Sequence, residues 1–122
     1  MKFTLEGAAS NLIRSYSSEE IRVGNQSVRS SCIVTADALI RDWRPRTLDE
    51  LEPSDLEAVF ALHPELALLG TGRRHQFAPA AIRSAFAAHS ISVESMDLGA
   101  ACRTFNILVQ EERRVAALLF LE

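Results

Sequence analysis

The chain has 122 residues, of which 48% are hydrophobic, and this is enough for one hydrophobic core, so we expect a single domain spanning residues 1–122. Its formal net charge of −3 argues against a dedicated nucleic-acid binder, which needs a broad basic face. Of the 13 basic residues only Lys2 is a lysine, so enzymes that work through a lysine Schiff base have almost no candidate residue.

The first 46 residues are predicted to form antiparallel strands. Short runs rich in β-forming residues occur at 11–16 and 20–23, and Gly24 with Asn25 suits a tight hairpin turn. Residues 27–35 alternate in a way typical of one half-buried strand, and a further short run covers residues 38–43. We therefore expect an antiparallel meander.

The composition changes near residue 47, where an α/β portion is expected to begin and to continue to residue 122. No lysine or arginine occurs from Thr47 to Gly72. Ser54 is followed three residues later by Glu57, which is the pattern of a capping box at the start of a helix. Pro64 is expected to end that helix.

From residue 65 onward the sequence predicts strands and helices in alternation. The runs that predict strands are residues 66–70, 91–96 and 114–121. Those that predict helices are residues 79–90, with Pro79 in the first turn, and residues 99–112. This alternation is typical of an α/β fold.

A glycine-rich turn follows the predicted strand at 66–70. Gly70, Thr71 and Gly72 are followed by Arg73 and Arg74, and such a turn before a helix can present backbone N–H groups to an anion. The third glycine of the dinucleotide fingerprint is missing, and no P-loop sequence is present. Two interpretations stay open: an anion site with the arginines as donors, or a sharp turn at the end of a sheet.

A second polar cluster surrounds the predicted helix at 99–112. Asp97 precedes the helix and is expected to cap its first turn. Arg103 and Asn106 are three residues apart and therefore neighbours on one helical face, which either faces solvent or faces a partner. Trp43, flanked by arginines, either stacks at a contact surface or plugs the end of the strand meander.

No pattern indicates catalysis or a resident cofactor. Cys32 and Cys102 form no C-x-x-C pair, which predicts reduced, buried thiols and a cytoplasmic protein. The histidines match no zinc spacing, and no G-x-S-x-G sequence provides a hydrolase nucleophile. The longest apolar run, Val115 to Leu121, is too short to span a membrane, and the N-terminal residues lack the apolar core of a secretion signal.

The second half of the chain resembles a known family of small α/β domains. It includes a mitochondrial complex I assembly factor, a mammalian adipogenesis-associated protein and many bacterial and archaeal proteins of unknown function. The resemblance covers Pro64 to Phe120 most specifically: PELALLGTGRRHQFAP, then ISVESMDLGAACRTFNILVQEERRVAALLF. Leu98 and Phe105 depart from the family pattern, and Phe105 lacks the hydroxyl of the tyrosine that is common there.

The resemblance implies a single compact domain with a mixed central sheet, helices on one side and an antiparallel β layer from the N-terminal half on the other. It implies no enzymatic activity, and assembly-factor members act by binding other proteins. We therefore expect a non-catalytic interaction module without a cofactor. The candidate binding residues are Gly70, Thr71, Gly72, Arg73, Arg74, Asp97, Arg103 and Asn106. The alternative is a binder of a small anion or nucleotide-related ligand, or an enzyme, that uses the cleft at the GTG turn.

Overall fold

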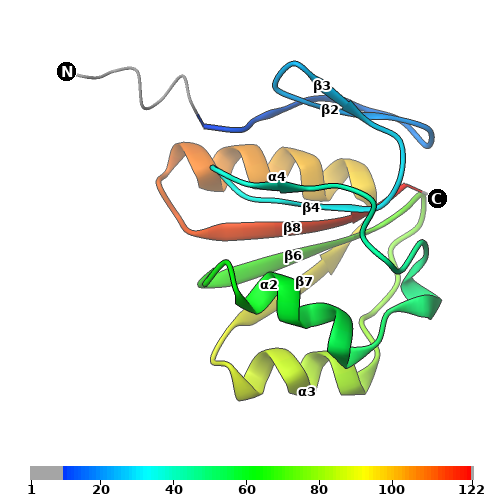
Figure 1. The fold of residues 1–122 in the computed structure, drawn as a ribbon, viewed down its shortest axis with the longest axis vertical. Helices are drawn as coiled ribbons and strands as arrows, with labels where there is room; N and C mark the ends of the chain where they lie inside the picture. The colour runs from blue at the N-terminus through cyan, green and yellow to red at the C-terminus, as the bar shows by residue number, and fades with distance from the viewer. Residues whose placement is uncertain (1–9, 122) are drawn as a thin grey trace.

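The computed structural model describes residues 10–121 and shows a five-stranded central sheet in the order β5-β4-β8-β6-β7 (Figure 1). Its strands are β4 (Cys32–Val34), β5 (Leu39–Ile40), β6 (Leu66–Thr71), β7 (Ser92–Met96) and β8 (Val115–Phe120). Strands β7, β6 and β8 are parallel, whereas β8–β4 and β4–β5 are antiparallel pairs. The expected α/β class with a mixed central sheet is confirmed.

A separate antiparallel sheet forms the N-terminal β layer. Its strands are β1 (Ile13–Tyr16), β2 (Ile21–Val23) and β3 (Gln26–Val28). The predicted hairpin turn lies between β2 and β3, where Gly24 has a φ of 58°. The ends of the expected single domain, residues 1–9 and 122, lie outside the described residues, and so do the N-terminal residues that are expected to lack a secretion signal.

The expectation of one strand over residues 27–35 is wrong. The chain leaves the first sheet after β3 and enters the central sheet with β4, so the two halves of that run lie in different sheets. The break falls at the buried Ser31, whose hydroxyl donates toward the main-chain carbonyls of Trp43 and Pro45. Because β4 and β5 pair within the central sheet, the expected meander ends at β3, well before residue 46.

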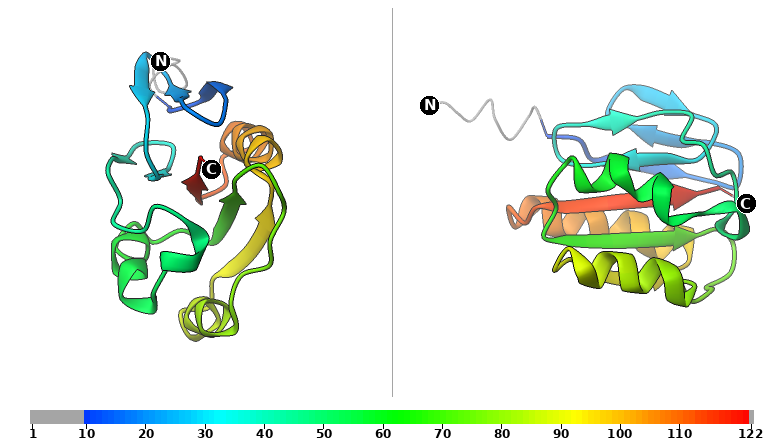
Figure 2. Two further views of the ribbon diagram at one scale, coloured as in Figure 1. Left: turned by 90° about the vertical axis from the view of Figure 1, so that its right-hand side faces the viewer. Right: turned by 60° about the horizontal axis from the view of Figure 1, so that its bottom comes forward.

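Helices cover both faces of the central sheet, so the expectation that they lie on one side is wrong (Figure 2). The helices are η1 (Leu48–Glu50), η2 (Pro53–Leu56), α2 (Glu57–Phe60), α3 (Ala80–Ala88) and α4 (Leu98–Gln110). From β6 the chain moves outward to β7, and from β7 it returns past β6 to β8. Because crossover connections between parallel strands are right-handed, two crossovers in opposite directions place their helices on opposite faces.

Two apolar cores result, one on each face of the sheet. Phe105 of α4 lies in the first core with the small antiparallel sheet, and Phe86 of α3 lies in the second. Trp43 belongs to the second core, where it is 7% exposed and stacks on Phe120 with ring centroids 5.6 Å apart. Trp43 is therefore buried, which contradicts the contact-surface interpretation, but it lies in the core on the face opposite the small antiparallel sheet and does not plug the end of a strand meander.

The capping box before α2 is shifted from the expected position. Glu52 and Asp55 form it, in place of Ser54 and Glu57, and it opens the short helix η2. The Asp55 carboxylate accepts the N–H of Glu52 at 2.9 Å and also pairs with Arg44 at 2.6 Å. The hydrogen bond from Arg44 lowers the pKa of Asp55, so the carboxylate stays charged in this role. A serine in place of Asp55 would be uncharged and could not form an ion pair with Arg44.

Candidate binding surface

The carboxyl ends of β6 and β7 lie side by side, and the chain leaves them toward opposite faces of the sheet. The loop after β6 leads to α3 on one face, and the turn after β7 leads to α4 on the other. Open α/β sheets bind ligands outside such points, because the departing loops leave room between them. The GTG turn and Asp97, both predicted as site residues, lie here.

Gly70 is required by close packing between β6 and α4. A Cβ atom added at Gly70 would lie 3.0 Å from both the Ala101 Cβ and a Leu119 methyl group. Gly72 has a φ of 92°, a conformation that favours glycine. Both glycines therefore have structural reasons to be present, and the turn and the helix that carries Arg103 lie in direct contact.

Thr71 and Gly72 fix the loop that carries the two exposed arginines. The Thr71 hydroxyl lies 2.6 Å from the Arg74 carbonyl oxygen and 3.2 Å from that of Met96, and it accepts the N–H of Gln76 at 3.0 Å. The N–H of Leu98 donates to the Gly72 carbonyl at 2.8 Å. The loop is thus anchored against the start of α4, while Arg73 and Arg74 are exposed.

The other predicted site residues hold α4 in place. Asp97 caps α4 as expected, since its carboxylate accepts the N–H of Ala100 at 2.8 Å. Asn106 accepts the N–H of Ile13 and donates to its carbonyl, both at 2.8 Å. Arg103 donates to the hydroxyl of Tyr16. Asn106 therefore joins α4 to β1, and Arg103 is exposed, whereas Asp97 and Asn106 are half-buried.

The sequence did not predict three exposed apolar side chains: Tyr16 beside α4, Ile107 on α4, and Phe77 in the loop that leads to α3. Tyr16 is 40% exposed, Phe77 81% and Ile107 55%. The Tyr16 ring covers Gly99 so closely that an added Cβ would lie 2.9 Å from it. A sequence signal existed for Ile107, because it lies outside the apolar stripe of its helix.

The two cysteines show no sign of nucleophilic reactivity. Burial raises the pKa of both Cys32 and Cys102 to about 12, so both are protonated thiols at neutral pH. Both are free and buried, as the sequence predicts. Within residues 10–121, no group of three or more His, Cys, Asp or Glu side chains is placed to hold a metal ion.

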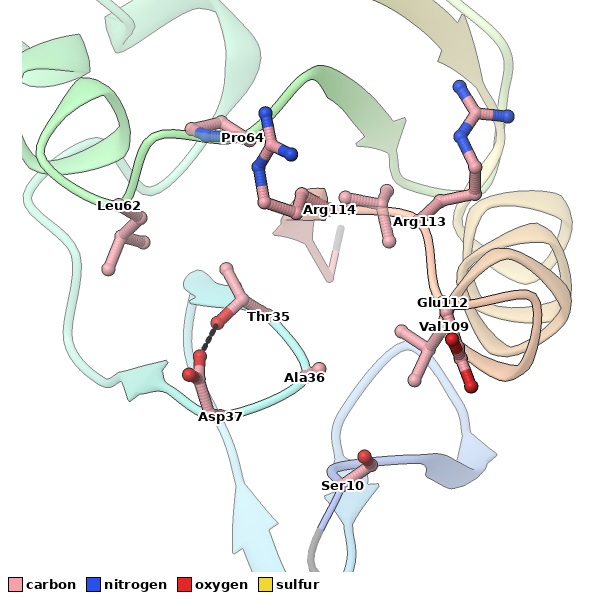
Figure 3. Close-up of a pocket in the computed structure, with 11 residues that line it drawn as sticks. Ser10, Thr35, Ala36, Asp37, Leu62, Pro64, Val109, Glu112, Arg113 and Arg114 are labelled. Carbon is pink, nitrogen blue, oxygen red and sulfur yellow. Dashed lines mark hydrogen bonds between the residues drawn. The ribbon is translucent and has the colours of Figure 1, made fainter. Parts of the chain in front are cut away.

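A hollow of about 530 Å³ lies at the opposite end of the sheet (Figure 3). Apolar side chains such as Leu62 and Val109 face it, and the Thr35 hydroxyl donates to Asp37 at its rim. Its lining residues are Ser10, Thr35, Ala36, Asp37, Leu62, Pro64, Val109, Glu112, Arg113, Arg114 and Val115. No residue of the sequence-predicted site lies among them.

The fold and this surface define a small α/β domain in which a mixed sheet lies between an α4–antiparallel layer and a second helical layer. Within residues 10–121, no helix has the length and apolar character needed to cross a membrane. The chain belongs to the family described as protein of unknown function (DUF498/DUF598), whose model matches residues 13–120.

Curated relatives cover both eukaryotic and bacterial proteins. The NADH dehydrogenase (ubiquinone) 1 alpha subcomplex assembly factor 3 of Danio rerio is 31% identical over 116 residues, which is 93% of this chain and 66% of that protein. The 13 kDa major membrane protein of Francisella tularensis is 33% identical over 72 residues, 59% of this chain and 58% of that protein. The matches thus span two thirds or less of these relatives.

Solved structures share the fold along nearly the whole chain. A crystal structure of a Bordetella parapertussis protein has a TM-score of 0.84 at 30% identity and covers 92% of this chain and 96% of its own. A Xanthomonas campestris protein solved by NMR has a TM-score of 0.83 at 35% identity, covering 92% and 85%. A Bordetella pertussis structure described as an Mth938-like domain, 24% identical, supports the fold alone.

Proposed function

We propose that the protein is a non-catalytic module that binds another protein, in a role similar to that of the relatives named as assembly factors. One observation carries this proposal: exposed aromatic, aliphatic and arginine side chains lie along α4 and in the loop that is bonded to its first turn. This α4 surface consists of Tyr16, Arg73, Arg74, Arg103 and Ile107. Tyrosine and arginine are residue types that interfaces favour. The buried, reduced cysteines support a cytoplasmic site of action.

The arrangement of the α4 surface supports this role. Tyr16 packs on Gly99 in the first turn of α4, and the loop that carries Arg73 and Arg74 is bonded through Gly72 to Leu98 in the same turn. Arg103 and Ile107 follow along the helix, four residues apart. Three arginines on one surface of a chain with net charge −3 complement an acidic partner surface.

The residues predicted from the sequence divide between two roles in this proposal. Arg73, Arg74 and Arg103 contact the partner. The remaining residues hold the contact surface in shape: Gly70, Thr71, Gly72, Asp97 and Asn106.

Ile107→Asp is expected to reduce recovery of a stoichiometric partner at least about tenfold when the tagged full chain is purified from its native cells. The substitution replaces an exposed apolar side chain of α4 by a carboxylate, which an interface would bury without a partner. Arg103→Glu is expected to act in the same direction by repelling an acidic surface. The measurement is quantitative mass spectrometry of the eluted complex.

The matched control is Arg46→Ala, since Arg46 is also exposed but lies before η1. It is expected to leave recovery unchanged, and all variants should keep the melting temperature of the parent. Equal recovery with all three variants, or recovery of chaperones alone, would contradict the proposal.

The alternative function, binding of a small anion at the GTG turn, predicts a different result. A ligand at 100 times its Kd adds roughly 2.7 kcal/mol of stability and raises the melting temperature by several degrees. Our proposal predicts no shift across a panel of phosphate-bearing metabolites in a thermal-shift assay. A shift that disappears in an Arg73→Ala, Arg74→Ala double variant would favour the alternative.

A further inference from the structure

We infer that the free edge of β7 is a strand-addition site, at which an extended, acidic segment of the partner protein pairs with the central sheet. The inference rests on the proposed function and specifies how the partner is held. Strand addition supplies affinity through main-chain hydrogen bonds and specificity through side chains at the ends of the strand.

β7 is a regular strand with one unpaired side. It lies at the end of the five-stranded sheet, beside β6 alone, and its five residues pair with β6 without a bulge (Figure 1). The Met96 carbonyl lies toward Thr71 of β6. The N–H and C=O groups of successive residues point alternately to the two sides of a strand. Those of Val93 and Ser95 therefore point to the free edge. Within residues 10–121, no main-chain group pairs with them there.

Polar side chains cover the edges of the small sheet. At β1, the Asn106 amide satisfies both backbone groups of Ile13. At β3, Arg41 donates to the Ser27 carbonyl at 2.9 Å. Unpaired edges invite association with other chains, and proteins usually blunt them in such ways.

The remaining edge of the central sheet is blunted as well. β5 is two residues long, and the Asn11 amide donates to the carbonyls of Thr35 and Ala38 beside it. β7 has five residues without a proline or a bulge, and its one charged side chain is the exposed Glu94. Among the strands of residues 10–121, β7 thus keeps a long edge without such cover.

The charges around β7 indicate what kind of strand fits. Arg73 and Arg74 are exposed beyond its carboxyl end, and the Thr71 hydroxyl brings the Arg74 and Met96 carbonyls together. A segment that runs along β7 therefore meets two guanidinium groups at that end, which favours acidic side chains. In a second copy of this chain, full antiparallel overlap would set Glu94 against Glu94, which is unfavourable.

Amide hydrogen exchange of the ¹⁵N-labelled full chain tests the free edge directly. The Val93 and Ser95 amides are expected to exchange at least about tenfold faster than those of Glu94 and Met96, whose N–H groups face β6. The binding probe is a synthetic peptide of six alternating threonine and valine residues followed by three glutamates. Its addition is expected to slow exchange at Val93 and Ser95 and to shift the Arg73 and Arg74 amide signals.

Ser95→Pro removes the outward N–H without breaking the ladder to β6, a position at which edge strands tolerate proline. It is expected to lower the affinity for the peptide at least about tenfold, whereas Ser95→Ala, which keeps the N–H, leaves this affinity unchanged. A peptide ending in three lysines is expected to bind at least about tenfold more weakly. Should Ser95→Pro fail to fold, a peptide N-methylated at alternate residues replaces it, and its loss of binding supports strand addition.

Three results would overturn the inference: equal affinity for Ser95→Pro and Ser95→Ala, undiminished binding of the N-methylated peptide, or no perturbation of β7. Concentration-dependent dimers that Ser95→Pro abolishes would identify a second copy as the occupant and overturn the proposed one. Co-purification separates the two proposals. If Ser95→Pro keeps a partner that Ile107→Asp loses, strand addition fails and the proposed function stands.

Discussion

Gly70→Val is expected to destabilise the protein by about 3 kcal/mol, because it forces side-chain atoms into a closed contact between β6 and α4. The first added carbon alone would lie 3.0 Å from the Ala101 Cβ and 3.0 Å from a Leu119 methyl group. Both neighbours are fully buried, so neither can move away without disturbing the core. Thermal unfolding should show a loss of about 10 °C in the melting temperature.

Ser92→Val provides the control for this substitution. It introduces the same side chain at an exposed position of a neighbouring strand and should change stability by less than about 0.5 kcal/mol. If Gly70→Val matched this control, then the close approach of α4 to the GTG turn would not be what requires glycine there.

Asn106→Ala is also expected to destabilise the protein by about 3 kcal/mol, since it leaves two backbone groups of Ile13 without partners. Each unsatisfied, partly buried group typically costs about 1–3 kcal/mol. Stability should be lost first in β1, because this amide bonds the main chain of β1 to α4, beside the hydrogen bond from Arg103 to the Tyr16 hydroxyl. Hydrogen exchange should show weakened protection in residues 13–16 at temperatures where the central sheet is intact.

Gln110→Ala, at an exposed position of the same helix, is the matched control and should leave stability within about 0.5 kcal/mol of the parent. A contrary result is informative. Unchanged stability combined with loss of the partner would return Asn106 to the contact role that the sequence left open.

The positions of the central strands and main helices were predictable because they depend on local pattern. The apolar run at 66–70 and the Asp97 cap are readable within a few residues of sequence, and both are confirmed. The face of the sheet that each helix covers could not be predicted from the sequence, because it depends on the strand order β8-β6-β7. The break at Ser31 likewise depends on acceptors 12 and 14 residues away.

The candidate site shows the same division between local and distant information. Arg73 and Arg74 were identified by their place after a strand, and they are exposed as a contact role requires. The role of Asn106 depends on Ile13, 93 residues earlier in the chain, which no local pattern indicates. The position of Tyr16 over Gly99 of α4 also joins distant parts of the chain, so it too required the fold.

Asp97 is the only residue between the end of β7 and the beginning of α4. Because this connection is a single residue and its carboxylate caps α4, the helix has little freedom to move relative to β7. Tyr16, Arg103 and the loop after β6 are all attached to that first helical turn or next to it. A binding partner would therefore meet a preorganised surface and associate by rigid fit, with little conformational entropy lost on this side of the complex.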